Sequence, residues 1–256
     1  MRHALVTGAG SGIGRAVALA LARTGHRVTL AGRRPEPLDA VAAEIDQAGG
    51  VGFSLPGFDV TDADAVRDGM ERAWEKFGEL AVLVNGAGAA PSAPFDRTDA
   101  ELWGRVLAIN LTGVFTVTQA ALPSIRRAGK GRIVTIASTA GLTGYPYVSA
   151  YCAAKHGVIG FSRALALELA RTDVTVNAVC PGFTDTPLLE GAIENIMEKT
   201  GRSEDEARAA LAKANPQGRL VSPEEVADAV LWLASPGASA ITGQAIPVAG
   251  GEIMAG

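Results

Sequence analysis

The 256-residue sequence contains few cysteines, little net charge and no long apolar run. Its two cysteines, Cys152 and Cys180, are too few for a disulfide scaffold, so we expect reduced thiols. The net charge of −4 argues against sequence-independent binding of nucleic acids. The 31 glycines follow no G-x-y period, which excludes a collagen-like chain. Because 48% of the residues are hydrophobic, the chain has enough apolar surface for a folded core.

A membrane span is not expected from the sequence. The longest apolar run, Ala16–Ala22, ends at Arg23 and is far shorter than the about 20 residues that cross a bilayer. A glycine-rich motif begins at Thr7 and leaves no room for a cleavable signal before it. We therefore expect a cytoplasmic protein with no membrane partner and no nucleic-acid partner. No metal site is predicted.

Short runs of apolar and β-branched residues alternate with stretches of helical period along the chain. In residues 38–45, for example, apolar residues recur at i, i+3, i+4 and i+7. The strands are predicted at His3–Thr7, Arg27–Ala31, Phe53–Asp59, Ala81–Asn85, Arg132–Ala137, Thr175–Val179 and Ala240–Val248. This alternation predicts an α/β fold, a Rossmann-like doubly wound parallel β-sheet with helices on both faces. We expect one domain over residues 1–256.

Residues 187–221, called the lid segment below, interrupt the alternation late in the chain. A first helix is expected to end at Gly201, and Ser203 with Glu206 forms a capping-box pattern for a second. Two inserted helices at this place favour a cover over a substrate site, although a solvated appendage has the same pattern. The regular alternation resumes at Ser222, which is expected to cap the next helix.

A glycine-rich turn joins the first predicted strand to the first predicted helix. Glycines in such a turn let backbone amides approach a pyrophosphate, and the helix N-terminus adds unpaired N–H groups. Because the turn follows a strand and opens a helix, it predicts dinucleotide binding rather than an ordinary flexible turn. The residues expected to bind the cofactor here are Gly8, Gly10, Ser11, Gly12, Ile13 and Gly14.

The end of the second strand bears on the choice between NAD and NADP. An acidic residue there binds the ribose 2′-hydroxyl of NAD, whereas an arginine accommodates the 2′-phosphate of NADP. This chain has Gly32 at the expected acidic position, followed by Arg33 and Arg34. The pattern favours NADP, with Arg33 as the binding residue. NAD stays open as an alternative, because one arginine-bearing turn indicates a preference and does not exclude NAD.

A tyrosine and a lysine are spaced to share one face of a predicted helix. Tyr151 and Lys155 are four residues apart, and Ser138 ends a predicted strand thirteen residues before Tyr151. Asn110 ends another apolar stretch. Each residue alone has an ordinary structural explanation. Together, behind a dinucleotide turn, they predict a catalytic site at the carboxyl ends of the strands.

The spacing Thr7-Gly8-x-x-x-Gly12-x-Gly14, with these four residues, resembles the short-chain dehydrogenase/reductase family. The resemblance covers nearly the whole chain. It implies catalytic roles for Asn110, Ser138, Tyr151 and Lys155. It also implies cofactor contacts for Asp59, Val60, Asn85, Ala87, Gly88, Pro181, Gly182, Thr184 and Thr186, in addition to Tyr151 and Lys155. One departure is Gly86, which replaces the second asparagine of the family's N-N-A-G motif and removes a tie between strands.

The family's chemistry is a hydride transfer that leaves an alkoxide in need of a proton donor. Free tyrosine has a pKa of about 10, so Lys155 and the oxidised nicotinamide are expected to lower the pKa of Tyr151 by about 2–3 units. Ser138 is expected to hydrogen-bond the substrate oxygen. By the resemblance, Lys155 also binds the nicotinamide ribose and Asn110 holds a water of a proton relay.

The substrate is constrained less sharply than the reaction. The segments expected to line the pocket, residues 89–95, 139–147 and the lid segment, are mostly apolar. Basic residues Arg126, Arg127, Lys130 and Arg132 are expected beside the site. They would suit an acyl carrier protein or coenzyme A, or would simply complement a helix C-terminus. The chain resembles 3-oxoacyl reductases and polyketide ketoreductases, which implies a ketone or acyl-thioester substrate.

Two alternative functions are also compatible with the sequence, besides that of a thioester reductase. One is a dehydrogenase of free alicyclic or aromatic alcohols, and the other is a non-catalytic dinucleotide-binding protein. The family resemblance implies a homotetramer. The segment Val248-Ala249-Gly250-Gly251 lacks the aspartate common before the paired glycines, which puts one turn hydrogen bond in doubt.

Overall fold

A seven-stranded parallel sheet forms the centre of the computed structural model, which describes residues 1–254. The strand order is β3-β2-β1-β4-β5-β6-β7, so the chain reverses direction across the sheet between β1 and β4. This confirms the predicted doubly wound, Rossmann-like sheet. The strands are β1 (His3–Thr7), β2 (Arg27–Ala31), β3 (Val51–Leu55), β4 (Leu80–Asn85), β5 (Arg132–Ile136), β6 (Thr175–Pro181) and β7 (Ala245–Val248).

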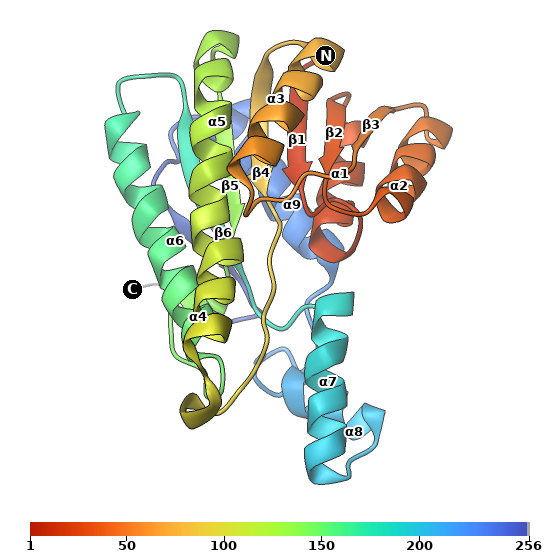
Figure 1. The fold of residues 1–256 in the computed structure, drawn as a ribbon, viewed down its shortest axis with the longest axis vertical. Helices are drawn as coiled ribbons and strands as arrows, with labels where there is room; N and C mark the ends of the chain where they lie inside the picture. Colours follow the sequence, from red (N-terminus) through yellow and green to blue (C-terminus); the bar gives the residue numbers. More distant parts are fainter. Residues whose placement is uncertain (255–256) are drawn as a thin grey trace.

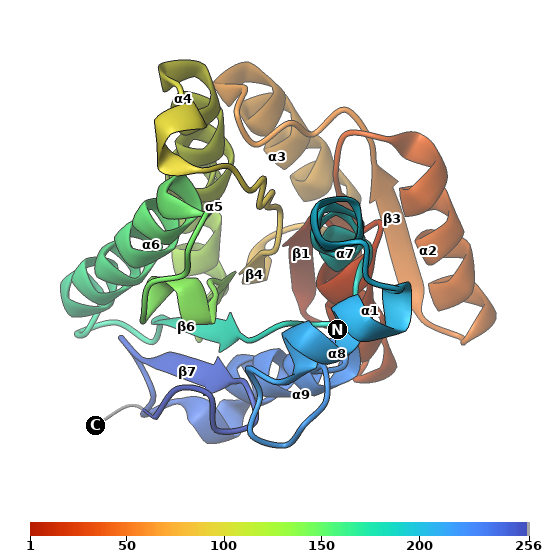
Figure 2. The same cartoon turned by 90° about the horizontal axis from the view of Figure 1, so that it is seen from below.

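Helices cover both faces of the sheet (Figures 1 and 2). One face packs against α1 (Gly12–Arg23), α2 (Pro35–Gln47) and α9 (Pro223–Ala234). The other packs against α3 (Ala63–Phe77), α5 (Gly113–Ala128) and α6 (Ser149–Glu168), with α4 (Ala100–Leu107) beside α6. The helices α7 (Pro187–Thr200) and α8 (Glu204–Ala212) project beyond the carboxyl ends of the strands (Figure 1).

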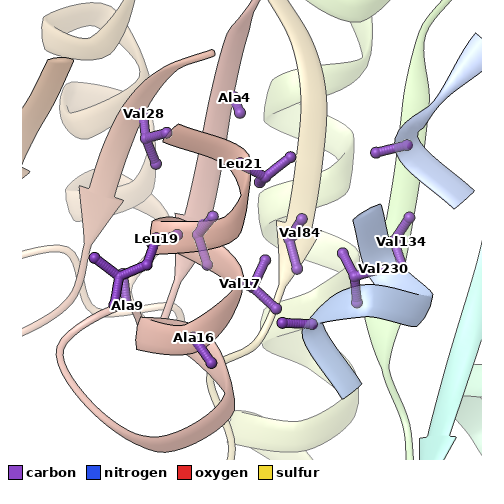
Figure 3. Packing of buried hydrophobic residues seen from close by; sticks show 14 of the residues in the cluster. Ala4, Ala9, Ala16, Val17, Leu19, Leu21, Val28, Val84, Val134 and Val230 are labelled. Carbon is purple, nitrogen blue, oxygen red and sulfur yellow. The ribbon is translucent and has the colours of Figure 1, made fainter. Parts of the chain in front are cut away.

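The core under α1 and α9 fixes the glycine-rich turn on the sheet. Val17 and Leu21 of α1 point to the strands beside Val230 of α9, and all three are buried (Figure 3). Burying a side chain of this size contributes about 1.5–3 kcal/mol relative to leaving it in water. The N-terminus of α1 is therefore held at the carboxyl end of β1 by packing along the whole helix.

Two predicted strands were wrong in extent. The third strand was expected at Phe53–Asp59 but is Val51–Leu55, because Pro56 cannot donate to the ladder and Gly57 turns the chain with φ +77°. The last strand was expected at Ala240–Val248 but begins at Ala245, after a turn in which Gly243 has φ +71°. The predicted bounds of β1 and β2 are confirmed, and β4, β5 and β6 differ from the prediction by one or two residues at one end.

Residues 100–128 are, within the part of the chain that the structure describes, the one helical stretch long and apolar enough to span a membrane by length and composition. In the fold this stretch contains α4, a π-helical turn (Ala108–Thr112) and α5. Val117, Ala121 and Ile125 of α5 are buried against the sheet. The stretch is therefore a core helix and not a membrane span.

Candidate active site

The glycine-rich turn has no room for side chains at two positions. A Cβ atom at Gly14 would lie 2.2 Å from the Gly8 carbonyl oxygen, and one at Gly8 would lie 2.9 Å from the Gly86 carbonyl oxygen. Gly8 also has φ +69°. Ser11 caps α1 with extended backbone but its side chain bonds none of the first N–H groups. These N–H groups and the helix dipole fit a dinucleotide pyrophosphate.

One cavity of about 1490 Å³ begins at this turn and runs along the carboxyl ends of the strands. Its wall contains nearly all of the predicted residues. From the cofactor set these are Gly8, Gly10, Ser11, Gly12, Ile13, Gly14, Arg33, Asp59, Val60, Ala87, Gly88, Pro181, Gly182, Thr184 and Thr186, and from the catalytic set Ser138, Tyr151 and Lys155. The cavity therefore joins the predicted nucleotide site to the predicted catalytic residues.

Asn85 does not line the cavity, so its contact with the cofactor stays a prediction. It is 3% exposed, and its Nδ2 donates to Thr118 Oγ1 at 3.0 Å and Thr135 Oγ1 at 3.4 Å. The side chain therefore ties β4 to α5 and β5. Sequence alone could not show this, because the end of β4 points Asn85 into the helical layer while Ala87 and Gly88 turn under the cavity.

Gly86 allows β4 to approach β1 more closely than an asparagine would. A Cβ atom at Gly86 would lie 2.7 Å from the Thr7 carbonyl oxygen. Thr7 Oγ1 accepts hydrogen bonds from the N–H groups of Gly86 at 3.0 Å and Ala87 at 3.1 Å. The tie between the strands that was expected to be missing is thus supplied by Thr7 and the backbone.

Ser138 lies just beyond β5 and caps the short 3-10 helix Thr139–Gly141. Its Oγ accepts the N–H of Ala140 at 3.1 Å. Because this bond uses an oxygen lone pair, the hydroxyl hydrogen is left to donate into the cavity. The residue is held by the turn that follows it, so its position does not depend on substrate.

Tyr151 lies in the first turn of α6, one helical turn before Lys155. The Nζ of Lys155 is 5.4 Å from the centre of the Tyr151 ring and donates to the Ile136 carbonyl at 2.8 Å. Lys155 is only 3% exposed. The carbonyl of Ile136 is a partner that the sequence did not reveal, and it holds the ammonium between α6 and the end of β5.

Burial within the protein shifts the pKa values of both Tyr151 and Lys155. Burial raises the pKa of Tyr151 to about 12, and the Ser138 hydroxyl opposes only part of this rise. Burial lowers the pKa of Lys155 to about 8. The expected lowering of the Tyr151 pKa is therefore not produced by the protein groups alone, because desolvation of the phenolate outweighs the hydrogen bond of Ser138. At neutral pH the phenol holds its proton.

Asn110 is fully buried in the π-helical turn and does not line the cavity. Its Nδ2 donates to the carbonyls of Ala89 at 2.8 Å and Val106 at 3.0 Å, and its Oδ1 accepts the N–H of Ala89 at 3.3 Å. Asn110 therefore clamps the loop after β4. A relay water held by this residue stays a proposal. Widened π turns are frequent at functional sites, but no sequence signal predicted this one.

Two arginines at the end of β2 line the cavity without an ion-pair partner among residues 1–254, whereas a third arginine, outside the cavity wall, is paired. Gly32, Arg33 and Arg34 line the cavity, and neither Arg33 nor Arg34 makes an ion pair with any residue from 1 to 254. Arg15, in contrast, binds both carboxylate oxygens of Glu44, at 2.9 and 2.7 Å. Among these three arginines, Arg33 and Arg34 are the ones whose guanidinium groups stay available to an anion.

The helices of the lid segment form the far wall of the cavity. Gly201 ends α7 with φ +67°, and Ser203 and Glu206 make the predicted capping box at α8. Asn195 of α7 donates to Ser92 Oγ at 2.9 Å, which joins the lid segment to the loop after β4. The segment thus lies over the cavity, and its opening and closing stay a proposal.

The predicted basic cluster does not lie beside the cavity within one chain. Its members are Arg126, Arg127, Lys130 and Arg132 at the end of α5 and the start of β5, whereas Ser138 follows the opposite end of β5. Arg132 is buried and donates to the Gly131 carbonyl at 2.8 Å, and Arg127 pairs with Glu79 at 2.7 Å. Residues 126–132 are therefore no part of the cavity wall.

Comparison with known proteins agrees with the family resemblance of the sequence motifs. Residues 2–196 match the family described as short chain dehydrogenase. A cis-4-hydroxycyclohexanecarboxylate dehydrogenase of Sinomonas cyclohexanicum is 42% identical, and the match covers 98% of this chain and 96% of that protein. A D-beta-hydroxybutyrate dehydrogenase of Cupriavidus necator is 40% identical, covering 98% of both chains. The 3-oxoacyl-(acyl-carrier-protein) reductase FabG of Thermotoga maritima is 38% identical, covering 98% and 97%.

A solved structure of actinorhodin polyketide ketoreductase with NADPH superposes with a TM-score of 0.92 at 42% identity, covering 98% of this chain and 97% of that one. The relatives divide between ketoacyl reductases and alcohol dehydrogenases. The chain therefore belongs to the short-chain dehydrogenase family and is an NAD(P)-dependent oxidoreductase that acts on a ketone or secondary alcohol.

Proposed function

We propose that this oxidoreductase prefers NADP(H) and interconverts 3-oxoacyl and 3-hydroxyacyl thioesters. The observation that carries the substrate class is the mixed wall of the cavity beyond the catalytic residues. Tyr145, Leu188 and Ile196 give it an apolar surface, and the exposed cations Arg97 and Lys199 line it as well. An acyl thioester combines an apolar chain with carrier phosphates, so it matches both parts of this wall.

The chain's own residues account for the proton chemistry at the carbonyl. When bound, the nicotinamide supplies or accepts the hydride. Tyr151 holds its phenol proton at neutral pH and donates it as negative charge develops on the substrate oxygen. Ser138 directs its free hydroxyl hydrogen at the same oxygen, which stabilises that charge. Lys155 keeps a positive charge near the Tyr151 ring and favours the phenolate that remains.

Arginine at position 33 is expected to set the cofactor preference. Replacing Arg33 by alanine removes charge-assisted hydrogen bonds, worth about 1.5–3 kcal/mol, to a 2′-phosphate. The Kd of NADPH should rise by about ten- to a hundredfold, whereas the Kd of NADH should stay within about twofold. Titration of nicotinamide fluorescence measures both. R72A, on the exposed face of α3, is the matched control. Equal losses for the two nucleotides in R33A would contradict the preference.

The substrate class is tested by mixing the protein with acetoacetyl-CoA and either NADPH or NADH and following nicotinamide absorbance. Oxidation of NADPH that is faster than that of NADH supports both parts of the proposal. Binding of NADPH without any turnover contradicts acetoacetyl-CoA as a substrate.

A second candidate is a dehydrogenase of free alicyclic alcohols. It is favoured by the cis-4-hydroxycyclohexanecarboxylate dehydrogenase at 42% identity and by the apolar part of the cavity wall. Reduction of NADP⁺ or NAD⁺ by cyclohexanol, without turnover of acetoacetyl-CoA, would select this candidate. A non-catalytic dinucleotide-binding protein would turn over neither substrate.

The proposed enzyme assembles as a homotetramer in the cytoplasm. Support for assembly comes from apolar side chains on the outer side of α4, α5 and α6, where Trp103, Phe115 and Leu167 are 39%, 45% and 80% exposed. Single aromatic residues of this size are frequently buried in subunit interfaces. Light scattering of the full chain measures the mass. Docking of an acyl carrier protein is a further part of the proposal. Light scattering of the full chain with the carrier protein present tests it.

A further inference from the structure

The C-terminal turn brings Glu252 into contact with a wall of the cavity. The hydroxyl of Tyr145 hydrogen-bonds Glu252 Oε1 and lies 2.8 Å from Thr139 Oγ1. A phenol has a single hydrogen, and the carboxylate can only accept, so Tyr145 donates to Glu252 and accepts from the Thr139 hydroxyl. Both hydrogen-bonding functions of this tyrosine are thus used within the protein.

Tyr145 lies between the two halves of the reaction site. It lines the cavity, and Thr139 follows the catalytic Ser138 directly. On its other side the ring meets Phe183 edge-on, with ring centres 6.0 Å apart at 77°. Phe183 also lines the cavity and follows Gly182, which is in the segment expected to hold the nicotinamide carboxamide. The Tyr145 ring therefore forms the substrate-facing wall between Ser138 and the nicotinamide end.

Glu252 itself is behind this wall rather than in the cavity. Its Oε2 is shielded from solvent and bonds no group of residues 1–254. A Cβ atom at Gly182 would lie 2.9 Å from that oxygen, so the carboxylate rests against the Gly182 backbone. A shielded carboxylate oxygen without a partner costs stability. The contact of Oε1 with Tyr145 offsets part of this cost and joins Glu252 to the cavity wall.

The hydrogen bond with Glu252 also gives Tyr145 a different role from that of the catalytic Tyr151. Burial and the hydrogen bond to Glu252 both raise the pKa of Tyr145 above its ordinary value. Its proton is therefore held on the phenol and directed at Glu252, away from the substrate. Among residues 1–254 no carboxylate hydrogen-bonds Tyr151, which is left as the tyrosine that serves the substrate oxygen.

We propose that Glu252 is a positioning residue for substrate binding, because it fixes the Tyr145 ring as a rigid wall of the substrate cavity. The inference rests on the proposed function only in its use of a ketone substrate. Glutamine at 252 retains an oxygen that accepts from the phenol, whereas alanine does not. A role through this hydrogen bond therefore predicts that E252Q restores what E252A loses.

The kinetic test compares E252A, E252Q, Y145F and the double variant E252A/Y145F, with acetoacetyl-CoA and saturating NADPH. Loss of one such hydrogen bond corresponds to about three- to tenfold in binding. We expect E252A and Y145F each to raise KM by that factor with kcat within about twofold, and the double variant to match Y145F. E252Q should stay within about twofold of the parent. Loss in E252Q equal to that in E252A, or further loss in the double variant, overturns the proposal.

An unfolding cycle on the parent, E252A, Y145F and the double variant, without cofactor or substrate, tests the contact independently of turnover. Thermal denaturation should show that E252A lowers Tm in the parent but not in Y145F. E224Q, an exposed glutamate on α9, is the matched control. Additive effects on Tm overturn the positioning role for any substrate. If coupling is present but acetoacetyl-CoA is not reduced, the proposed substrate class fails. The kinetic cycle is then run with cyclohexanol and NADP⁺, where an unchanged KM overturns the positioning role.

Discussion

Replacing Tyr151 by phenylalanine is expected to lower kcat by about a thousandfold while leaving the Kd of NADPH within about threefold. The magnitude is that of a lost general acid, which contributes about 10²–10⁴. Phenylalanine keeps the ring that packs near Lys155 and removes only the hydroxyl that faces Ser138. Because the Lys155 contact with the Ile136 carbonyl does not involve this hydroxyl, the cofactor end of the site should be unaffected.

The measurement is a pair of assays on the same preparation of Y151F. Steady-state reduction of acetoacetyl-CoA, or oxidation of cyclohexanol, gives kcat, and nicotinamide fluorescence gives the Kd. Full activity in Y151F would remove Tyr151 as the proton donor. A parent protein that binds NADPH, turns over neither substrate and behaves like Y151F would instead favour a non-catalytic dinucleotide-binding protein.

The features that sequence predicted best depend on neighbours in the chain. The glycine turn, the Tyr151–Lys155 spacing and the capping box at Ser203 are each set within a few residues by local geometry. Helical and strand periods then fixed the order of elements, and parallel strands bring their carboxyl ends to one edge. This is why residues as far apart as Gly8 and Lys155 were correctly expected in one cavity.

The features that sequence missed depend on contacts between distant segments. Asn85 and Asn110 sit in motifs that predict contact with the cofactor or substrate, yet their amides bind side chains or backbone behind the cavity. Nothing in the sequence indicates which face of β4 or of the π-helical turn points inward. Glu252 lies more than a hundred residues from Tyr145, so no spacing rule could pair them.

The basic cluster was placed wrongly for a different reason, which involves no contact between distant segments. Its residues are neighbours in sequence, and the expectation that they adjoin the site assumed that the end of α5 faces the cavity. A helix that leads into a parallel strand ends at the amino edge of the sheet, opposite the site. The topology alone was therefore sufficient to correct the expectation, once the strand β5 was placed after α5.

Replacing Lys155 by methionine is expected to lower activity by at least about a hundredfold and to change how stability depends on pH. Lys155 is buried with a pKa of about 8, against 10.5 in an unfolded chain. Between these values the unfolded state binds more protons, so the free energy of unfolding of the parent rises with pH. A difference of about 2.5 pKa units corresponds to about 3 kcal/mol. Methionine fills a similar volume and does not titrate.

Cys180 and Tyr151 are among the buried groups that act in the opposite direction, which is why the variant is needed. Burial raises the pKa of Cys180 to about 11 and of Tyr151 to about 12, so both lower stability as pH increases above about 9 and 10. They are present in the parent and in K155M, so the part of their effect that does not involve Lys155 cancels in the difference. The Lys155 charge lowers the pKa of Cys180, so its removal raises that pKa further and acts in the same direction as the expected fall. Denaturant unfolding of the two proteins without cofactor, from pH 8 to 10.5, should show the stability of K155M relative to the parent falling by about 3 kcal/mol. A stability difference between K155M and the parent that stays constant from pH 8 to 10.5 would contradict the lowered pKa of Lys155 in the folded protein.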